Sequence, residues 1–380
     1  MIKVASVFGT RPEAAKMAPL VNALERDARV RSIVCVTAQH REMLDQVLAI
    51  FGIAPAFDLN IMRENQTLAD ITTRALGGLL EVFSAERPDL VLVHGDTTTT
   101  LAASLAAFYA RIPVGHVEAG LRTYDKYQPF PEEMNRRLTT ALTDLHFAPT
   151  CAAKANLLRE NVPESGIFVT GNTAIDCMKT TVSENYIFEN AALNHIDYAG
   201  RRVVLLTAHR RENLGKPLEN ICAAVRHITE RYPDVEFVYP VHLNPAVRGT
   251  VYPALGAVPR VRLLDPVDLR DMHNLMKRSY LVLTDSGGLQ EEAPALDKPV
   301  VVLRGVTERP EGLAAGTLLL AGTETGAIVS AVSGLLDDKA AYDKMASAPN
   351  PYGDGNAAER IKNAVLFHFG LINKRPEDFH

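Results

Sequence analysis

Short apolar runs alternate with longer amphipathic stretches along the whole chain. The apolar runs have the length of strands and are nearly continuous, as in IKVASVF at residues 2–8 and YLVLTDS at residues 280–286. The stretches between such runs carry apolar residues at helical spacing, for example at residues 13–27, 97–111 and 218–232. Near-continuous apolar strands that alternate with helices are typical of parallel sheets covered by helices. The pattern therefore predicts an α/β fold.

Polar, irregular sequence around residues 184–202 separates the apolar runs into two sets of about five. A chain of 380 residues is too long for one ordinary core and suits two domains. We predict two Rossmann-like, doubly wound domains that face an interdomain cleft. The first is expected over residues 1–172, joined by a C-terminal helix at residues 356–380. The second is expected over residues 173–355.

Composition excludes several classes of protein. Apolar residues make up 47% of the chain, so we expect a folded protein rather than a disordered one. The net charge of −5 and the lack of a Lys/Arg block argue against nucleic acid and membrane as partners. No apolar run approaches the ~20 residues of a spanning helix, and the N-terminus has no signal-peptide layout. Four separated cysteines without a CxxC pair fit a cytoplasmic enzyme.

Ionisable residues gather where the predicted strands end. Asp96 and Glu118 each follow an apolar run in the first half of the chain. His209 and Arg210 follow one run in the second half, and Ser286-Gly287-Gly288 follows another. Ligands of open α/β sheets bind outside the carboxyl ends of the strands, where helix N-termini converge. We therefore expect these side chains to line the cleft between the two domains.

The first strand leads into the segment GTRPEAAK at residues 9–16. Thr10 and Glu13 have the spacing of a capping box, so a helix should begin here. Arg11 and Lys16 place positive charge near the start of that helix, where the helix dipole disfavours cations. A bound anion would explain both cations.

Most of these residues also have a structural explanation. Asp96 serves equally well as the N-cap of the next helix, and Glu132, just after Pro131, as a favourable charge in a first helical turn. The loop Ser286–Gly288 is either a tight turn or a backbone cradle for phosphate. Glu118 is harder to explain structurally, because acids are depleted in strands and rarely buried unpaired. His209 stands beside two arginines at a strand end, which favours function over a core position.

The sequence predicts no metal and no cofactor. His94 with Asp96, and His116 with Glu118, are i,i+2 pairs that each point to one face of a strand, but no tight ligand motif such as HExxH accompanies them. No GxGxxG follows the first strand, and neither GxxxxGK[ST] nor GxSxG occurs. Dinucleotide, P-loop and nucleophile-elbow chemistry are therefore not expected.

Nine segments, taken in order, resemble the non-hydrolysing UDP-N-acetylglucosamine 2-epimerase family, which has the GT-B fold. They span essentially the whole chain and read FGTRPEAAKMAPL, TAQHREMLDQ, VHGDTTTT, HVEAGLRT, PFPEEMNRR, TGNTAID, TAHRREN, TDSGGLQEEAP and TERPEG. The resemblance implies reversible conversion of UDP-N-acetylglucosamine to UDP-N-acetylmannosamine by anti elimination of UDP and re-addition. The intermediate would be 2-acetamidoglucal. It also implies a homodimer that supplies N-acetylmannosamine units for surface polysaccharide.

The resemblance further implies roles for individual residues. Those expected to be catalytic are Asp96, Glu118, Glu132 and His209. Asp96, Glu118 and His209 are also expected to contact the UDP-sugar, together with Arg11, Lys16, Arg210, Ser286, Gly287, Gly288, Glu292 and Arg309. Among these, Glu292 matches the position that binds the ribose hydroxyls. Gln39 and Glu132 match a site for a second, activating UDP-N-acetylglucosamine.

Three other activities are compatible with the same residues. A GT-B glycosyltransferase that uses a UDP-sugar donor would share the fold and the diphosphate loop. A hydrolysing 2-epimerase would release free N-acetylmannosamine. A UDP-sugar sensor without catalysis would not need three acids and His209 together.

Overall fold

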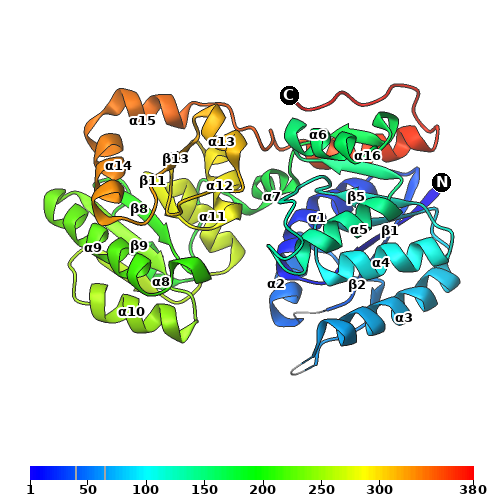
Figure 1. The fold of residues 1–380 in the computed structure, drawn as a ribbon, viewed down its shortest axis with the longest axis horizontal. Coiled ribbons are helices and arrows are strands. Elements are labelled where there is room, and N and C mark those ends of the chain that lie inside the picture. Colours follow the sequence, from blue (N-terminus) through cyan, green and yellow to red (C-terminus); the bar gives the residue numbers. More distant parts are fainter. Residues whose placement is uncertain (39–40, 64–65) are drawn as a thin grey trace. The chain divides into compact units, whose positions relative to one another are not determined.

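The computed structural model describes residues 1–38, 41–63 and 66–380, and it divides into two compact units (Figure 1). Unit 1 comprises Met1–Thr180 and Tyr352–His380, and unit 2 comprises Thr181–Pro351. Each unit is built on one parallel sheet whose strands are connected by helices. The predicted α/β class with two Rossmann-like domains is confirmed.

Unit 1 contains a seven-stranded sheet in which β1 lies between β2 and β4. In sheet order the strands are β3 (Phe57–Asp58), β2 (Val30–Val36), β1 (Ile2–Phe8), β4 (Leu90–His94), β5 (Val114–Val117), β6 (Leu145–Ala148) and β7 (Ile167–Val169). The strand order reverses direction at β1, so right-handed connections place helices on both faces of the sheet.

The helices of unit 1 form two packed groups. α1 packs against α2 and α16, whereas α4 packs against both α3 and α5. The helices are α1 (Arg11–Glu25), α2 (Arg41–Phe51), α3 (Leu68–Glu86), α4 (Thr98–Tyr109), α5 (Glu132–Leu142), α6 (Cys151–Arg159), α7 (Thr173–Thr181), which reaches the first residue of unit 2, and α16 (Ala357–His368). A short 3-10 helix covers Glu164–Gly166.

Unit 2 contains a six-stranded sheet in which the order of strand addition reverses at β8, which lies between β9 and β11. In sheet order the strands are β10 (Val261–Leu264), β9 (Val235–Pro240), β8 (Arg202–Thr207), β11 (Leu281–Thr284), β12 (Val300–Val302) and β13 (Leu318–Leu320). The helices are α8 (Ala191–Asn194), α9 (Lys216–Arg231), α10 (Pro245–Leu255), α11 (Leu269–Arg278), α12 (Gly287–Glu292), α13 (Pro310–Ala315), α14 (Thr325–Asp337) and α15 (Lys339–Ala346), with 3-10 turns at Arg211–Asn213 and Ala293–Leu296.

The hydrophobic pattern explains how these helices attach to their sheets. In unit 2, α9 buries Ile221, Val225 and Ile228, which lie on one helical face, against β8, β9 and the helices α10 and α14. In unit 1, the predicted capping box is confirmed, since the Thr10 side chain accepts from Glu13 N–H and the Glu13 carboxylate accepts from Thr10 N–H. The start of α1 is therefore fixed by local sequence.

Three strands were not predicted from the sequence. β3, β7 and β13 are only two or three residues long, and all three lie at the edges of their sheets. Such short segments contain too few residues to show a strand pattern. The residues that position the candidate site follow longer strands, namely β4, β5, β8 and β11.

Two predicted boundaries differ from the structure. The sequence placed the first domain boundary between residues 172 and 173, but α7 clusters with unit 1 as far as Thr180. The physical reason is Asp176, whose carboxylate accepts hydrogen bonds from Ala357 N–H and Ala358 N–H at the start of α16. The helix predicted over residues 356–380 is also shorter, because α16 ends at His368 and Gly370 follows with a φ of +66°.

Within the residues that the structure describes, every helix is too short or too polar to cross a membrane.

Candidate functional site

Glu118 lies directly after β5 in a conformation that an ordinary residue rarely adopts, with a φ of +63°. Its Oε2 atom accepts the Lys16 ammonium in an ion pair and the Asn172 amide at 2.9 Å, and it lies 3.6 Å from His94 Nε2. Burial favours the neutral acid, but Lys16 and His94 outweigh it and hold the pKa of Glu118 well below its usual range. Glu118 is therefore a buried carboxylate rather than a carboxylic acid.

Lys16 reaches this carboxylate from α1. The sequence explained Lys16 by a bound anion, whereas in the structure Lys16 forms an ion pair with the carboxylate of Glu118. Arg11, in the first turn of the same helix, is exposed. The two cations of the segment GTRPEAAK therefore occupy different environments.

Asp96 lies between β4 and α4, but it does not cap the helix. Thr97 is the N-cap, because its hydroxyl accepts from Thr100 N–H. The structural explanation of Asp96 is therefore wrong. Its carboxylate instead accepts Arg136 Nη1 at 2.5 Å. Burial raises the pKa of Asp96, the neighbouring acids Glu118 and Glu132 raise it further, and Arg136 opposes them.

Glu132 and Glu133 begin α5 and have different surroundings. Glu133 is fully buried and accepts hydrogen bonds from Thr123 N–H, Tyr124 N–H and Arg136 Nη2. These contacts give it a structural role. Glu132 is half-buried, and no hydrogen bond to its side chain occurs among the described residues. Its charge contributes to the raised pKa of Asp96, which places it electrostatically beside the other two acids.

In unit 2, Asp285 organises the loop that follows β8. It is fully buried, and its Oδ2 atom accepts His209 N–H at 2.7 Å, Arg210 N–H at 2.8 Å and Asn213 Nδ2 at 3.0 Å. The same aspartate directly follows the neighbouring strand β11. One carboxylate thus joins the loop after β8 to the end of β11, the adjacent strand.

The His209 side chain is partly exposed and stacks on His242, with ring centroids 5.3 Å apart and ring planes at 8°. Burial lowers the pKa of His209, and His242 and Arg210 lower it further against the opposing charge of Asp285. The imidazole is therefore mainly neutral at neutral pH. Its partly exposed ring does not fit the alternative of a core histidine.

The loop Ser286-Gly287-Gly288 opens α12 beside two guanidinium groups. A Cβ atom added to Gly287 would lie 3.4 Å from Arg309 Nη2 and 3.6 Å from Arg210 Nη2. Arg309 is itself ion-paired through Nε with the buried Glu291. Gly288 lies close to the carboxylate of Glu292, because its added Cβ would lie 3.6 Å from Oε1. Two guanidinium groups beside a glycine-rich turn suit a phosphate group.

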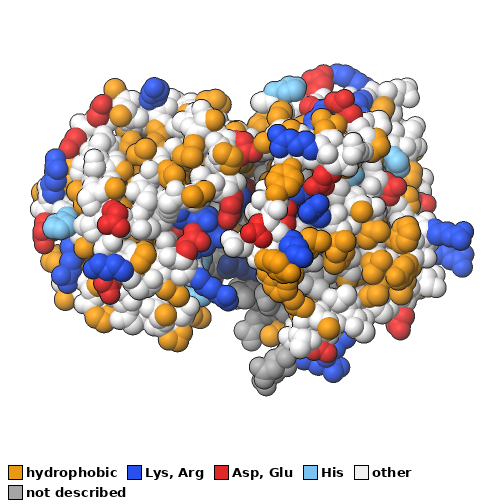
Figure 2. Space-filling model, in the orientation of Figure 1, with side chains coloured by type: hydrophobic (Ala, Val, Ile, Leu, Met, Phe, Trp, Pro, Cys, Tyr) orange, Lys and Arg blue, Asp and Glu red, His pale blue; other side chains and the backbone are white. Residues whose placement is uncertain are grey.

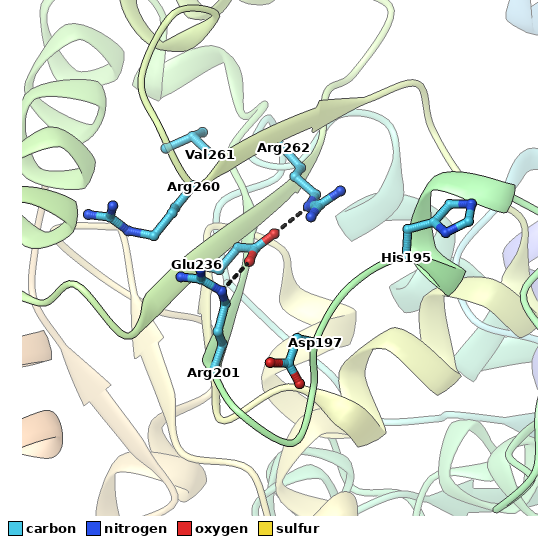
Figure 3. Close-up of a pocket in the computed structure, with 7 residues that line it drawn as sticks. All are labelled: His195, Asp197, Arg201, Glu236, Arg260, Val261 and Arg262. Atoms are coloured by element: carbon cyan, nitrogen blue, oxygen red, sulfur yellow. Dashed lines mark hydrogen bonds and ion pairs between the residues drawn. The ribbon is translucent and has the colours of Figure 1, made fainter.

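A different pocket of unit 2 lies at the opposite ends of the strands (Figure 3). It has a volume of about 270 Å³ and is lined by His195, Asp197, Arg201, Glu236, Arg260, Val261 and Arg262. Glu236 is buried and paired with Arg201 at 3.3 Å and with Arg262 (Figure 3). Because Glu236 lies near the start of β9 and Val261 begins β10, this pocket lies away from the carboxyl ends where such sheets bind ligands.

His94 and His116, the histidines of the two i,i+2 pairs, are both buried among groups of the protein. His116 Nε2 lies 2.7 Å from the carbonyl oxygen of Gly95, and burial lowers its pKa to about 3. His94 is buried beside Glu118. Among residues 1–38, 41–63 and 66–380, no group of three or more His, Cys, Asp or Glu side chains is arranged to hold a metal ion. Gln39, predicted to bind a second nucleotide sugar, lies outside the described residues.

Comparison with known proteins gives one family. The family model for UDP-N-acetylglucosamine 2-epimerase matches residues 22–366. UDP-N-acetylglucosamine 2-epimerase from Bacillus subtilis is 57% identical over 381 residues, covering 100% of this chain and 98% of the relative. This chain belongs to the UDP-N-acetylglucosamine 2-epimerase family. The prediction of the family, and with it of an isomerase, is confirmed.

Solved structures of the epimerase family show the same fold. MnaA from S. aureus, solved with UDP, superimposes with a TM-score of 0.91 at 52% identity over 100% of both chains. UDP-GlcNAc 2-epimerase from Neisseria meningitidis, solved with UDP-GlcNAc, gives a TM-score of 0.88 at 50% identity over 96% of this chain and 100% of the relative. These neighbours confirm the predicted GT-B type of fold.

The sequence did not identify several residues that hold the site of this epimerase together. Arg136, Asn172 and Asp285 each hydrogen-bond a candidate site residue, either its side chain or its backbone. His273 is a fourth, since its Nε2 lies 3.6 Å from Glu292. Their partners are distant in sequence, by 54 residues for Asn172 and Glu118. Each of the four is also almost fully buried. A polar residue at a position that the hydrophobic pattern marks as buried needs a hydrogen-bond partner, and this was the one signal in the sequence that could have indicated them.

Proposed function

We propose that the protein interconverts UDP-N-acetylglucosamine and UDP-N-acetylmannosamine without net hydrolysis. The choice of substrate is supported by relatives of about 50% identity that were solved with UDP-GlcNAc and with UDP. The proposal assigns proton transfer to the acids of unit 1 and diphosphate binding to the loops of unit 2.

The chemistry of the substrate favours elimination over simple deprotonation. Carbon 2 carries an acetamido group, so its proton is not acidic. If the bond from carbon 1 to the diphosphate oxygen breaks as this proton leaves, the electron pair of the C–H bond forms the double bond of 2-acetamidoglucal, and UDP is released. The reverse addition, with the proton delivered to the other face of carbon 2, gives the epimer. The reaction therefore needs a proton acceptor and a proton donor on opposite faces of the sugar.

The observation that carries this proposal is the pair of acids Asp96 and Glu118. Their pKa values are shifted in opposite directions, since Glu118 is held ionised beside Lys16 and Asp96 is pushed towards the neutral acid by burial. Two carboxyl groups whose environments separate their pKa values are suited to the roles of base and acid. In the resting enzyme, Glu118 is ready to accept a proton, and Asp96 retains one more readily. Glu132 supplies the third acid of the same region.

Unit 2 is proposed to stabilise the negative charge that develops on the departing diphosphate. Gly287 leaves room in front of Arg210 and Arg309. His209, mainly neutral, can donate one hydrogen bond to a phosphate oxygen without adding charge. Glu292, close to Gly288, is proposed to bind the ribose hydroxyls. Arg11 of unit 1, exposed at the start of α1, is proposed as a further cation for the phosphates.

Incubation with UDP-N-acetylglucosamine alone tests this function. Proton NMR should show UDP-N-acetylmannosamine accumulating to an equilibrium mixture, with no acceptor present. A glycosyltransferase would leave the donor unchanged. A hydrolysing enzyme would release free N-acetylmannosamine and UDP in equal amounts and would not reach an equilibrium between the two nucleotide sugars.

We also propose that the protein is a homodimer. Hydrophobic side chains gather over α4 on the surface of unit 1 (Figure 2). At the end of this helix, Phe108 and Tyr109 are 58% and 59% exposed and their rings lie 6.1 Å apart. Leu138 on α5, which packs against α4, is 47% exposed. An exposed group of aromatic and aliphatic residues is typical of a surface that a partner covers, and a second copy of the chain is the proposed partner.

Three finer assignments complete the proposal. The product is proposed to supply N-acetylmannosamine units for surface polysaccharide. The reaction is proposed to take place in the cytoplasm, as the separated cysteines without a CxxC pair indicate. Glu132 and Gln39 are proposed to bind a second UDP-N-acetylglucosamine as activator, which would make the rate depend on substrate concentration in a sigmoidal way.

A further inference from the structure

We propose that Asn172 is a positioning residue for Glu118, and that it fixes which oxygen of the carboxylate exchanges a proton with the sugar. Asn172 holds Oε2, so that Oε1 is the reacting atom. This inference rests on the proposed epimerase reaction, because it assigns a part in that reaction to a residue outside the acids themselves.

The two oxygens of Glu118 have different surroundings. Oε2 accepts the Lys16 ammonium and the Asn172 amide and is the oxygen nearest to His94. Among the residues that the structure describes, no donor forms a hydrogen bond with Oε1. A carboxylate oxygen that already accepts two strong donors is a poor base, because those donors stabilise its negative charge. The lone pairs of Oε1 are therefore the ones available to carbon 2.

The orientation of the Asn172 amide is fixed by its other contacts. Its Oδ1 atom accepts the N–H of Ala174 at 3.0 Å, which turns Nδ2 towards Glu118 at 2.9 Å. Exchanging the two amide atoms would place an oxygen against a carboxylate and an N–H against an N–H, which is unfavourable at both ends. The backbone N–H of Asn172 also donates to the carbonyl oxygen of Tyr352 at 2.6 Å. Three contacts thus hold a residue that is only 3% exposed.

The backbone of Glu118 makes such an anchor necessary. A residue with φ near +60° is strained by the contact of its own Cβ with the backbone. Strained residues persist only when surrounding contacts determine their conformation, and they cluster at functional sites. Lys16, on a flexible side chain, supplies charge to Glu118, whereas Asn172 supplies a rigidly placed donor.

The alternative is that Asn172 serves only to begin α7. An asparagine that accepts from the N–H two residues later is a common turn and cap arrangement. Asn172→Asp separates the two roles, because aspartate keeps the acceptor oxygen for Ala174 N–H but replaces the donor to Glu118 with a second negative charge. Asn172→Ser also keeps a capping oxygen and adds no charge. It provides the test if the aspartate variant folds poorly.

The experiment measures kcat, KM and their pH dependence for both variants. The charged or titratable groups around Glu118 are Lys16 from α1, His94 from β4 and Asp96 after β4, and all three are unchanged in these variants. We expect kcat to fall roughly 10- to 100-fold, the rate equivalent of losing a hydrogen bond to a charged group, with KM changed little. In Asn172→Asp the acid limb of the pH profile should move to higher pH, because the ionised form of Glu118 loses a donor and gains a repelling charge.

Asn22→Ser is the matched control, since Asn22 in the same unit donates only to a backbone carbonyl, that of Phe51 at 3.3 Å. Its kcat and pH profile should match those of the wild type. Folded Asn172 variants with the wild-type kcat and acid limb would overturn the inference and leave Asn172 a cap residue. Failure of the wild-type protein to interconvert the two nucleotide sugars would instead refute the proposed function, so the two failures are distinguishable.

Discussion

Arg136 donates through Nη1 to Oδ2 of Asp96 across 2.5 Å. Its other terminal nitrogen donates to the buried Glu133 at 2.9 Å, so one guanidinium joins a candidate catalytic acid to a structural one. Burial raises the pKa of Asp96, and the charge of Arg136 is the largest effect that opposes it. The pKa of Asp96 is therefore held down in part by a residue that takes no part in the proposed proton transfer.

The first prediction concerns this contact. In Arg136→Met, Asp96 should keep its proton to higher pH, because the cation that favours its ionised form is gone. If Asp96 donates the proton in the proposed reaction, the alkaline limb of kcat/KM for UDP-N-acetylglucosamine should move to higher pH. Arg137→Met, at an exposed position one residue along α5, is the control and should not move it. An unchanged limb in the Arg136 variant would show that Asp96 is not the donor.

The second prediction concerns acid stability. Although burial opposes it, hydrogen bonds from Arg136, Thr123 and Tyr124 lower the pKa of Glu133 from its usual value of 4.5. A group with a lowered folded-state pKa stabilises the protein above its unfolded pKa, and this contribution is lost as the pH falls through the folded pKa. Glu133→Gln should therefore reduce the free energy of unfolding at pH 7 by about 2 kcal/mol.

The difference in the free energy of unfolding between wild type and Glu133→Gln should become smaller as the pH falls below 4.5. Denaturant titrations at a series of pH values measure it. Glu132→Gln is the matched control, because no hydrogen bond to the Glu132 side chain occurs in the described part of the chain, and it should reduce the free energy of unfolding at pH 7 much less than Glu133→Gln does. A constant penalty for Glu133→Gln would indicate lost packing rather than lost charge.

The third prediction tests the diphosphate loop without relying on turnover. In Gly287→Ala, the new methyl group would meet Arg309 and Arg210 at ordinary contact distances of 3.4 and 3.6 Å, so the fold should be unaffected. The methyl group would nevertheless occupy the space in front of both guanidinium groups. We expect the affinity for UDP, measured by calorimetry, to fall at least about tenfold, equivalent to about 1.4 kcal/mol.

Gly249→Ala is the control for this change, since an added Cβ at that position of α10 meets no atom within 4 Å. It should bind UDP as the wild type does. If Gly287→Ala bound UDP with wild-type affinity, the diphosphate would bind elsewhere and the loop would be only a tight turn.

The fourth prediction concerns the apolar surface of α4. Replacing Phe108 and Tyr109 together by glutamate should convert the proposed dimer to monomer in sedimentation equilibrium, because charge would be buried without a partner. Ile187→Glu, at an equally apolar but 79% exposed position of unit 2, should leave the assembly intact. A wild-type protein that sediments as a monomer would refute the proposed homodimer directly.

Local patterns in the sequence predicted the fold well. The capping box of Thr10 and Glu13 and the strand-length apolar runs are signals carried by neighbouring residues, and both are present in the structure. The α7 boundary could not be read in the same way. It depends on Asp176, which contacts α16 about 180 residues later in the chain. The edge strands β3, β7 and β13 were too short to show a pattern.

The sequence allowed candidate site residues to be named, but it did not reveal their contacts. Asp96 and Glu118 were expected from their positions after strands, yet the sequence left Asp96 undecided between a cap and an acid. Thr97 decides the matter by taking the cap itself, and nothing in the run of threonines indicates which of them would do so. The positive φ of Glu118 and its hydrogen bond with Asn172 result from tertiary packing, which local propensity does not encode.

The last prediction follows the proton of carbon 2. If Glu118 removes it and a carboxyl on the other face returns one, solvent must supply the returning hydrogen at least in part. Acids in contact with water exchange protons faster than a typical kcat of roughly 10 s⁻¹, so the removed proton should not be conserved. In deuterated water, UDP-N-acetylmannosamine should therefore carry deuterium at carbon 2, and recovered UDP-N-acetylglucosamine should become labelled on long incubation, as followed by proton NMR.

Asp96→Asn, Glu118→Gln and Glu132→Gln should each suppress both epimerisation and labelling, because an amide keeps the shape of the acid but can neither accept nor donate the proton as a carboxyl group does. Glu25→Gln, at an exposed position of α1, should change neither. A variant that slows re-addition more than elimination should release 2-acetamidoglucal and UDP into solution, since both exist in the proposed pathway. Product that retains protium fully at carbon 2 would reject solvent-exchanged proton transfer, and a wild-type rate in Glu118→Gln would leave its strained backbone and its ion pair with Lys16 without a catalytic purpose.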